Sequence, residues 1–144
     1  MISRTTHSVE ETDALAAQVA DLARPGDLIV LIGGLGAGKT TFVRGFVDGI
    51  GADDRATSPT FALVHNYESR IPVVHADLYR LASEHEVLDL GLDESLADGA
   101  IVVVEWGDLA EGLLRPDRLT VTITDVDETS RQFVFDGWAD RWSA

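Results

Sequence analysis

The sequence predicts one α/β domain in three layers, α/β/α, with a mainly parallel sheet and an antiparallel hairpin at the sheet edge. Three observations support this prediction. An apolar run at 28–32 is followed by a glycine-rich turn and then by a helical pattern. A second apolar run, from Ile101 to Val104, is typical of a parallel strand that is buried on both faces. Polar and apolar side chains alternate at 117–124 and 131–135, which is typical of an antiparallel hairpin.

The composition limits both the size of the protein and its partners. With 144 residues the chain is long enough for one domain, 1–144, but not for two. Cysteine is absent, which excludes disulfides, cysteine–zinc sites and a thiol nucleophile. The net charge of −14 repels phosphate backbones, so any role in nucleic-acid chemistry is expected to pass through a protein partner.

The sequence also lacks membrane and export signals. No apolar run approaches the roughly 20 residues that span a bilayer. The first seven residues lack the apolar core of a secretion signal. We therefore expect no membrane association and a cytoplasmic location.

The chain begins with a short edge strand, expected at 3–7. Ser8 then caps a helix that extends to the turn at 24–27, and Glu11 stands where a capping box places an acid. We call residues 3–27 the leader and expect it to have a structural role without site residues. The strand at 28–32, the glycine-rich turn and a helix at 41–50 follow.

The rest of the chain alternates strands with short helices. The expected strands are 61–67, 73–76, 101–104, 117–124 and 131–135, and the expected helices are 83–90, 93–98 and 109–114. Trp138 and Trp142, one helical turn apart, are expected to cover the edge of the sheet.

The turn between residues 33 and 40 matches the phosphate-binding pattern G-x-x-x-x-G-K-[ST] at every fixed position. Glycines let backbone N–H groups converge on phosphate oxygens, and the following helix adds its own unpaired N–H groups and the positive end of its dipole. Lys39, the only lysine in the chain, is expected to reach the β- and γ-phosphates, and the Thr40 hydroxyl to ligate Mg²⁺. The expected nucleotide-binding residues are Gly33, Gly34, Leu35, Gly36, Ala37, Gly38, Lys39 and Thr40.

A site that hydrolyses a nucleotide also needs an acidic group near Mg²⁺, usually at the carboxyl end of a neighbouring strand. Asp77 and Glu105 both follow expected strands. Aspartate is the conventional metal ligand, whereas Glu105 has the better strand and could also orient a water, so both stay candidates for the metal and for catalysis. His75 is expected to pack or hydrogen-bond, because a histidine without other ligands seldom holds a metal.

Two further segments could touch a nucleotide. Ser58-Pro59-Thr60 lies between the glycine-rich helix and the next strand, where Thr60 could reach the γ-phosphate or simply turn into the strand. Trp106 directly follows the second acid and could stack on adenine, contact a partner or pack in the core.

Four blocks in this order resemble the TsaE (YjeE) ATPases, and the resemblance covers about residues 8–136. The blocks are GGLGAGKTT from Gly33, TSPTF from Thr57, HADLYRL from His75 and VEWGD from Val104. The last three are much more specific than the first, which many nucleotide-binding proteins share. The chain departs from the pattern at Gly34, where many members carry an acid; this changes little, because the backbone cradles the phosphates.

The resemblance implies an ATPase that uses Mg²⁺ and acts in threonylcarbamoyladenosine modification at position 37 of tRNAs reading A-starting codons. Its hydrolysis of ATP would support the multiple-turnover cycle of a TsaD–TsaB complex, and that complex would hold the tRNA. The resemblance also implies that Thr41 continues the phosphate contacts of Lys39 and Thr40. Asp77 and Glu105 would then serve the metal and the water, with Trp106 near the nucleotide.

Two other functions share the glycine-rich turn. A small-molecule kinase of the P-loop class usually carries an arginine-bearing lid, and the segment 91–99 is acidic and has no arginine. A nucleotide-sensing module would bind without meaningful turnover. A screen for phosphorylated acceptors and single-turnover kinetics would discriminate between these alternatives.

Overall fold

The computed structural model describes residues 1–33, 37–51, 64–78, 91–105 and 117–142. In chain order the described elements are β1 (Ile2–Thr6), α1 (Val9–Leu22), β2 (Leu28–Gly33), α2 (Ala37–Ile50), β3 (Val64–Tyr67), β4 (Val73–Asp77), α4 (Leu92–Ala97), β5 (Ile101–Glu105), β6 (Leu119–Asp125) and β7 (Arg131–Asp136). The helices expected at 83–90 and 109–114 lie outside the described residues, as does the start of the strand expected at 61–67.

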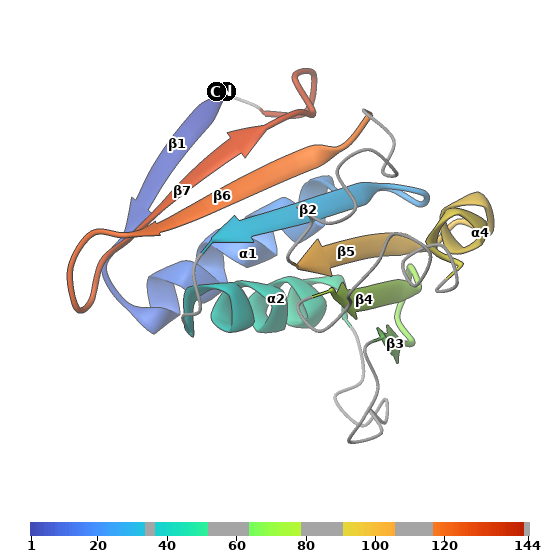
Figure 1. Ribbon diagram of the computed structural model, residues 1–144, viewed down its shortest axis with the longest axis horizontal. Coiled ribbons are helices and arrows are strands. Elements are labelled where there is room, and N and C mark those ends of the chain that lie inside the picture. The colour runs from blue at the N-terminus through green and yellow to red at the C-terminus, as the bar shows by residue number, and fades with distance from the viewer. Residues whose placement is uncertain (34–36, 52–63, 79–90, 106–116, 143–144) are drawn as a thin grey trace.

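The described strands form one mixed sheet in the order β1-β7-β6-β2-β5-β4-β3 (Figure 1). The central strands β6, β2, β5 and β4 run parallel to one another. The expected hairpin of β6 and β7 is confirmed, but it does not form the edge, because β1 pairs antiparallel with β7 beyond it. At the other end β3 also pairs antiparallel, with β4. The sheet is therefore parallel at its centre and antiparallel at both ends.

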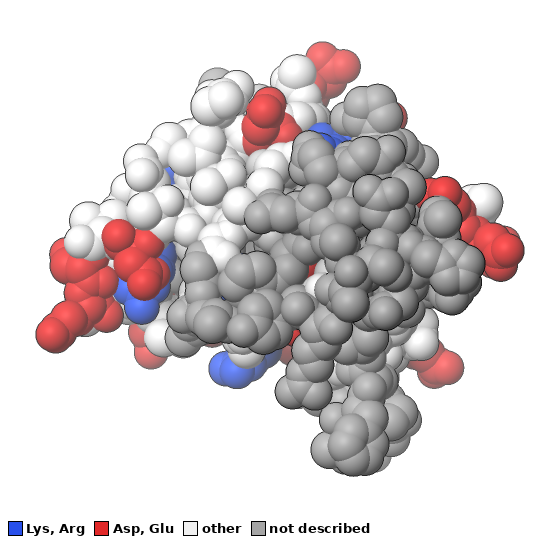
Figure 2. Space-filling model, in the orientation of Figure 1, with Lys and Arg blue, Asp and Glu red and all other residues white. Residues whose placement is uncertain are grey.

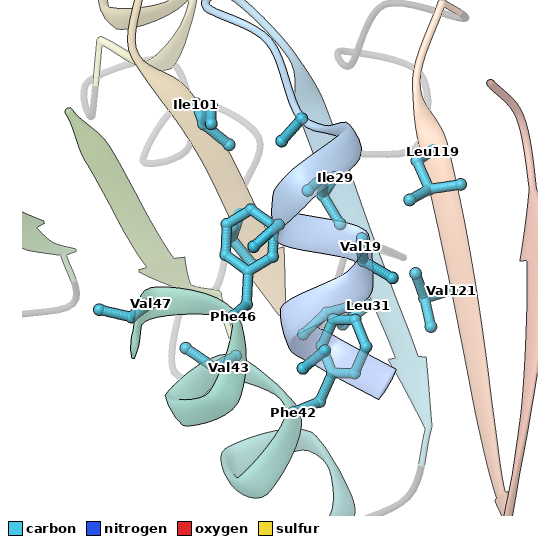
Figure 3. Close-up of a cluster of buried hydrophobic side chains, with 14 of the residues drawn as sticks. Val19, Ile29, Leu31, Phe42, Val43, Phe46, Val47, Ile101, Leu119 and Val121 are labelled. Carbon is cyan, nitrogen blue, oxygen red and sulfur yellow. The ribbon is translucent and has the colours of Figure 1, made fainter. Parts of the chain in front are cut away.

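Helices cover both faces of this sheet, which confirms the three expected layers. On one face, α1 and α2 pack on the core that Figure 3 draws, where Phe42 and Phe46 of α2 lie against strand residues such as Leu31. On the other face, Leu92 and Leu96 of α4 pack on a second cluster that includes Val102. Every residue of β5 is buried, as the continuous apolar run predicts.

The two long helices lie very close to each other because α2 has glycines at the contact. A Cβ at Gly45 would lie 2.9 Å from Asp13 Cα, and a Cβ at Gly49 would lie 2.9 Å from Ala20 Cβ. No larger residue fits at either position unless the helices move apart. This close packing holds α2 against α1 on one face of the sheet.

The local sequence determines where α1 and α2 begin. The Ser8 hydroxyl accepts a hydrogen bond from Glu11 N at 3.1 Å, as expected of an N-cap, while the Glu11 carboxylate accepts from His7 N at 2.8 Å instead of from the cap residue. Helix α2 begins at Ala37, four residues earlier than expected. Lys39 and Thr40 already have helical backbone, so they belong to its first turn.

The end of the chain forms a turn rather than the helix implied by the tryptophan spacing. Trp138 has a left-handed backbone, with φ 54°. The Trp142 indole donates to Gly137 O at 2.9 Å and packs on Phe135 with ring centroids 5.2 Å apart. Both tryptophans are partly buried against the core of the α1/α2 face.

Acidic side chains gather at two places on the face shown in Figure 2, near the β6–β7 turn and near α4. The exposed acids of the end of β6 and the β6–β7 turn are Asp125, Asp127 and Glu128, and those of α4 and its C-cap are Asp93, Glu94 and Asp98. Within the described ranges, no helix is long and apolar enough to cross a membrane.

Candidate nucleotide-binding site

The glycine-rich turn begins where β2 runs close beside β6. Gly33, the last residue of β2, pairs with Ile123, and a Cβ on it would lie 2.9 Å from Ile123 O. A Cβ on Gly38 would lie 3.2 Å from Ile123 Cγ2. Space alone thus excludes a Cβ at Gly33, whereas a Cβ at Gly38 would require the Ile123 side chain to move by a few tenths of an ångström.

Lys39 is almost enclosed at the start of α2, with 4% of its surface exposed. Its Nζ donates to Gly33 O at 3.4 Å, which folds the side chain back over the turn. Burial lowers the pKa of Lys39, and the negative charges of Glu105 and Asp77 partly oppose that shift. Lys39 and the two acids thus form one electrostatic cluster.

Asp77 and Glu105 end neighbouring parallel strands and are paired in register. Because side chains alternate along a strand, both carboxylates project to the α2 face, toward Lys39. Glu105 is 8% exposed, whereas Asp77 is half-buried. The structure therefore brings together the lysine and both acids that the sequence singles out.

His75 joins this cluster, which the sequence analysis did not foresee. Its Nε2 lies 2.6 Å from Glu105 Oε2, and both side chains are largely buried. The two-residue period of a strand could have indicated this position, because His75 is two residues before Asp77 and therefore lies on the same face of the sheet. The expectation that His75 would hydrogen-bond is confirmed, and its partner is the candidate catalytic acid.

A cavity of about 230 Å³, here called the acid-side cavity, opens beside this cluster. It is lined by Thr40, Val43, Arg44, Val47, His65, Tyr67, His75 and Glu105. Thr40 is exposed at the first turn of α2, so its hydroxyl and the Glu105 carboxylate border the same space.

A second cavity, of about 240 Å³, lies on the other side of the α2 N-terminus and is here called the hairpin-side cavity. It is lined by His7, Ser8, Val9, Thr12, Gly38, Thr41, Glu128, Thr129 and Arg131. Its walls come from the leader and from the β6–β7 turn, two segments to which the sequence analysis assigned no site. No local motif marks it, because it exists only once these distant segments meet α2.

Five of the expected site residues lie outside the described residues: Gly34, Leu35, Gly36, Thr60 and Trp106. For Ala37 only the backbone is described, at the start of α2. Their roles stay predictions.

The donor set of this site fits Mg²⁺, which takes oxygen ligands and is usually held by one or two carboxylates together with substrate phosphates. Thr40, Asp77 and Glu105 offer a hydroxyl and two carboxylates within one cluster. Among the described residues, no group of three or more histidine, cysteine, aspartate or glutamate side chains could hold a metal ion. Mg²⁺ usually completes its coordination with substrate phosphates and water.

Comparison with known proteins agrees with this architecture. A family model described as "Threonylcarbamoyl adenosine biosynthesis protein TsaE" matches residues 6–133. The chain belongs to the TsaE family. The match includes the described cluster of Lys39, His75, Asp77 and Glu105 and extends into β7.

Several TsaE proteins are similar over most of their length. The Bacillus subtilis (strain 168) protein is 40% identical over 138 residues, which cover 95% of this chain and 86% of the relative. The Streptomyces coelicolor protein is 41% identical over 137 residues, which cover 90% of this chain and 92% of the relative. Each is named "tRNA threonylcarbamoyladenosine biosynthesis protein TsaE".

A solved structure supports the fold independently. The crystal structure of Bacillus subtilis YdiB superposes with a TM-score of 0.79 at 35% identity, covering 97% of this chain and 87% of that one. This likeness supports the mixed α/β fold described above.

Proposed function

We propose that this chain is an ATP hydrolase that supports formation of N6-threonylcarbamoyladenosine at position 37 of tRNAs reading A-starting codons. The observation that carries the proposal is the cluster of Lys39, Asp77 and Glu105 at the N-terminus of α2, in a chain of the TsaE family. Each part of this cluster has a defined task in phosphoryl transfer to water.

Binding of the triphosphate rests on α2. Its first N–H groups and its dipole attract the β- and γ-phosphates, and the Lys39 ammonium adds a compact charge. Thr40, Asp77 and Glu105 would hold Mg²⁺, which when bound neutralises developing charge on the phosphates. Glu105 would also orient the attacking water, with Asp77 as the alternative for that task.

The two cavities suggest how ATP is oriented. The γ-phosphate must lie near the acids, so the nucleoside end extends toward the hairpin-side cavity, where Thr41 and Thr12 offer hydroxyls. Val9 lines that cavity and is 55% exposed, so a larger residue there is tolerated by the fold. Val9→Trp is expected to weaken binding of ATP but not of inorganic tripolyphosphate, as measured by calorimetry. If the wild type and Val9→Trp bind ATP with equal affinity, the nucleoside does not occupy this cavity.

A partner must complete the function. The net charge of −14 opposes direct binding of tRNA, so a basic surface for tRNA belongs to another protein, which we propose is a TsaD–TsaB-like complex in the cytoplasm. Thr60 and Trp106 would contact the nucleotide. The domain boundaries of this activity are proposed as 1–144.

The decisive experiment replaces the chromosomal gene by a Lys39→Ala variant and analyses the nucleosides of cellular tRNA by mass spectrometry. Loss of threonylcarbamoyladenosine together with loss of ATP binding by the purified, folded variant is the expected result. Unchanged threonylcarbamoyladenosine in a strain without another such ATPase would refute the function.

A small-molecule kinase of the P-loop class is the alternative function. The observation that favours it is the acid-side cavity, where a phosphate acceptor could bind. An acceptor bound there would lie beside Glu105. Its volume, about 230 Å³, is below the roughly 300–1,000 Å³ typical of ligand pockets, so only a small acceptor would fit. Transfer of ³²P from γ-labelled ATP to a small molecule, rather than to water, would favour the kinase.

A further inference from the structure

His75 and Glu105 approach each other from neighbouring strands on the α2 face of the sheet. His75 is on β4, opposite Val103 of β5, and Glu105 is two residues further along β5 on the same face. The 2.6 Å contact therefore joins diagonal neighbours, and only the long side chains bridge it. With 14% and 10% of their side-chain surfaces exposed, water competes little for either group.

The chemistry of the two groups assigns the direction of the hydrogen bond. An ionised carboxylate only accepts, so Nε2 of His75 must carry the proton and donate to Oε2 of Glu105. A hydrogen bond to an ionised group is about twice as strong as one between neutral groups. The bond thus holds one carboxylate oxygen and leaves Oε1 for the chemistry of the site.

Without that bond, Glu105 has a competing partner. The charge of Glu105 acts on Lys39 more strongly than that of Asp77 does, and the ammonium is nearly enclosed. A carboxylate released from His75 would turn toward this ammonium and neutralise the charge that α2 offers to phosphates. His65 packs edge-on against His75, with ring centroids 5.7 Å apart, and limits rotation of the imidazole.

We propose that His75 is a positioning residue, which holds Glu105 by one oxygen in the orientation required for ATP hydrolysis. The inference rests on the proposed hydrolase function and assigns the role of a residue that acts through Glu105 without touching the nucleotide. Partners that orient a metal ligand or catalytic acid in this way typically contribute 10–100-fold to activity.

Three variants separate positioning from simple packing. His75→Leu removes the donor and keeps an apolar side chain, whereas His75→Gln places an amide N–H where Nε2 stood. Val74→Ala is the matched control, because it disturbs packing on the same strand, β4, but on the face of the sheet opposite Glu105. In steady-state assays of the full chain, His75→Leu is expected to lower kcat about 10–100-fold with the KM for ATP nearly unchanged, and His75→Gln to recover most of that loss.

A double-mutant comparison tests whether His75 acts through Glu105. In a Glu105→Gln background, His75→Leu is expected to add no further loss of kcat, because the carboxylate that it positions is already gone. A second measurement needs no nucleotide. In the proton NMR spectrum of the free protein, the Hε2 signal of His75 should lie downfield in the wild type and be absent from that position in Glu105→Ala.

The outcomes are distinct for the two proposals. A wild-type chain that shows no turnover, alone or with its partner complex, refutes the hydrolase function, and the positioning role falls with it. Turnover in the wild type that persists in His75→Leu, or a His75→Gln variant as slow as His75→Leu, overturns the positioning role alone. So would an additional loss in the Glu105→Gln background or an Hε2 signal unaffected by Glu105→Ala.

Discussion

A buried ion pair ties the end of the chain to the turn that leads into β2. The Arg141 guanidinium binds the Asp27 carboxylate with two hydrogen bonds, Nη1–Oδ2 at 2.5 Å and Nη2–Oδ1 at 3.0 Å. The same guanidinium donates to Leu22 O at 3.2 Å and lies 4.4 Å from the centroid of the Trp138 ring. Asp27 also accepts from Arg24 N at 2.5 Å, so its carboxylate organises the whole turn. The pair thus holds β2, the strand that ends in the glycine-rich turn, at its opposite end.

Arg141→Met keeps the aliphatic length of the side chain and leaves Asp27 without its charge partner. Removing one member of a buried pair costs about 3–5 kcal/mol, because the remaining charge is left uncompensated. Asp27 and Arg141 keep 11% and 15% of their side-chain surfaces exposed, so water can reach Asp27 in the variant. We therefore expect the lower end, a loss of about 3 kcal/mol in the free energy of unfolding. For a chain of this size that loss lowers Tm by about 6–12 °C.

The assay is urea unfolding followed by tryptophan fluorescence and circular dichroism, with calorimetry for Tm. Arg4→Met is the matched control, because Arg4 is exposed on the edge strand and its loss should change stability by less than about 0.5 kcal/mol. Asp27→Asn completes a double-mutant cycle, in which a coupling energy above about 1.5 kcal/mol is expected. A loss below about 1 kcal/mol in Arg141→Met, or additive effects in the cycle, would refute the reasoning.

Three further predictions concern the site and the helix that carries it. Because burial lowers the pKa of Lys39, ATP affinity should fall as the pH rises through that lowered pKa. At a pH close to that pKa, calorimetry in two buffers should detect proton uptake on binding, and binding without proton uptake at that pH would contradict this. Because Lys39 is the only lysine, its ¹³Cε signal can be assigned and its pKa followed by NMR titration. That pKa should fall further in Glu105→Gln than in Asp77→Asn, because the charge of Glu105 opposes the effect of burial more strongly. The reverse order would contradict the cluster geometry. Gly45→Ala should destabilise the fold by about 1–3 kcal/mol in urea, although alanine favours helices, because its Cβ would lie 2.9 Å from Asp13 Cα; a stabilised variant would show that the helices can separate freely.

The parts of the fold that the sequence predicts well are those with strong local signals. The apolar run of β5 from Ile101 to Val104, the capped α1 and the alternating β6–β7 hairpin each carry a pattern within a few residues. Strand order follows from no such pattern. The pairing of β1 with β7 joins residues more than a hundred positions apart, and nothing in 2–6 distinguishes an edge beside β7 from any other edge. The sequence therefore predicts the β6–β7 hairpin correctly but places it at the edge, where the structure has β1.

The same division applies to the site. Lys39, Asp77 and Glu105 were predictable because a glycine-rich turn and the ends of parallel strands must meet at one edge of the sheet. The Asp27–Arg141 pair and the hairpin-side cavity were not, because each arises from tertiary contacts between segments that carry no motif of their own. His75 stands between these cases: its face followed from the strand period, but its hydrogen bond to Glu105 depends on the register between β4 and β5.

The start of α2 explains why two adjacent threonines cannot be equivalent. Consecutive helical residues are about 100° apart around the axis, so Thr40 and Thr41 must face different surroundings once α2 begins at Ala37. Thr40 is exposed and lines the acid-side cavity, whereas Thr41 is buried and lines the hairpin-side cavity. Because α2 begins earlier than expected, the two threonines face two different cavities. We therefore propose that Thr40 serves the γ-phosphate beside the acids and that Thr41 serves the nucleoside end of ATP.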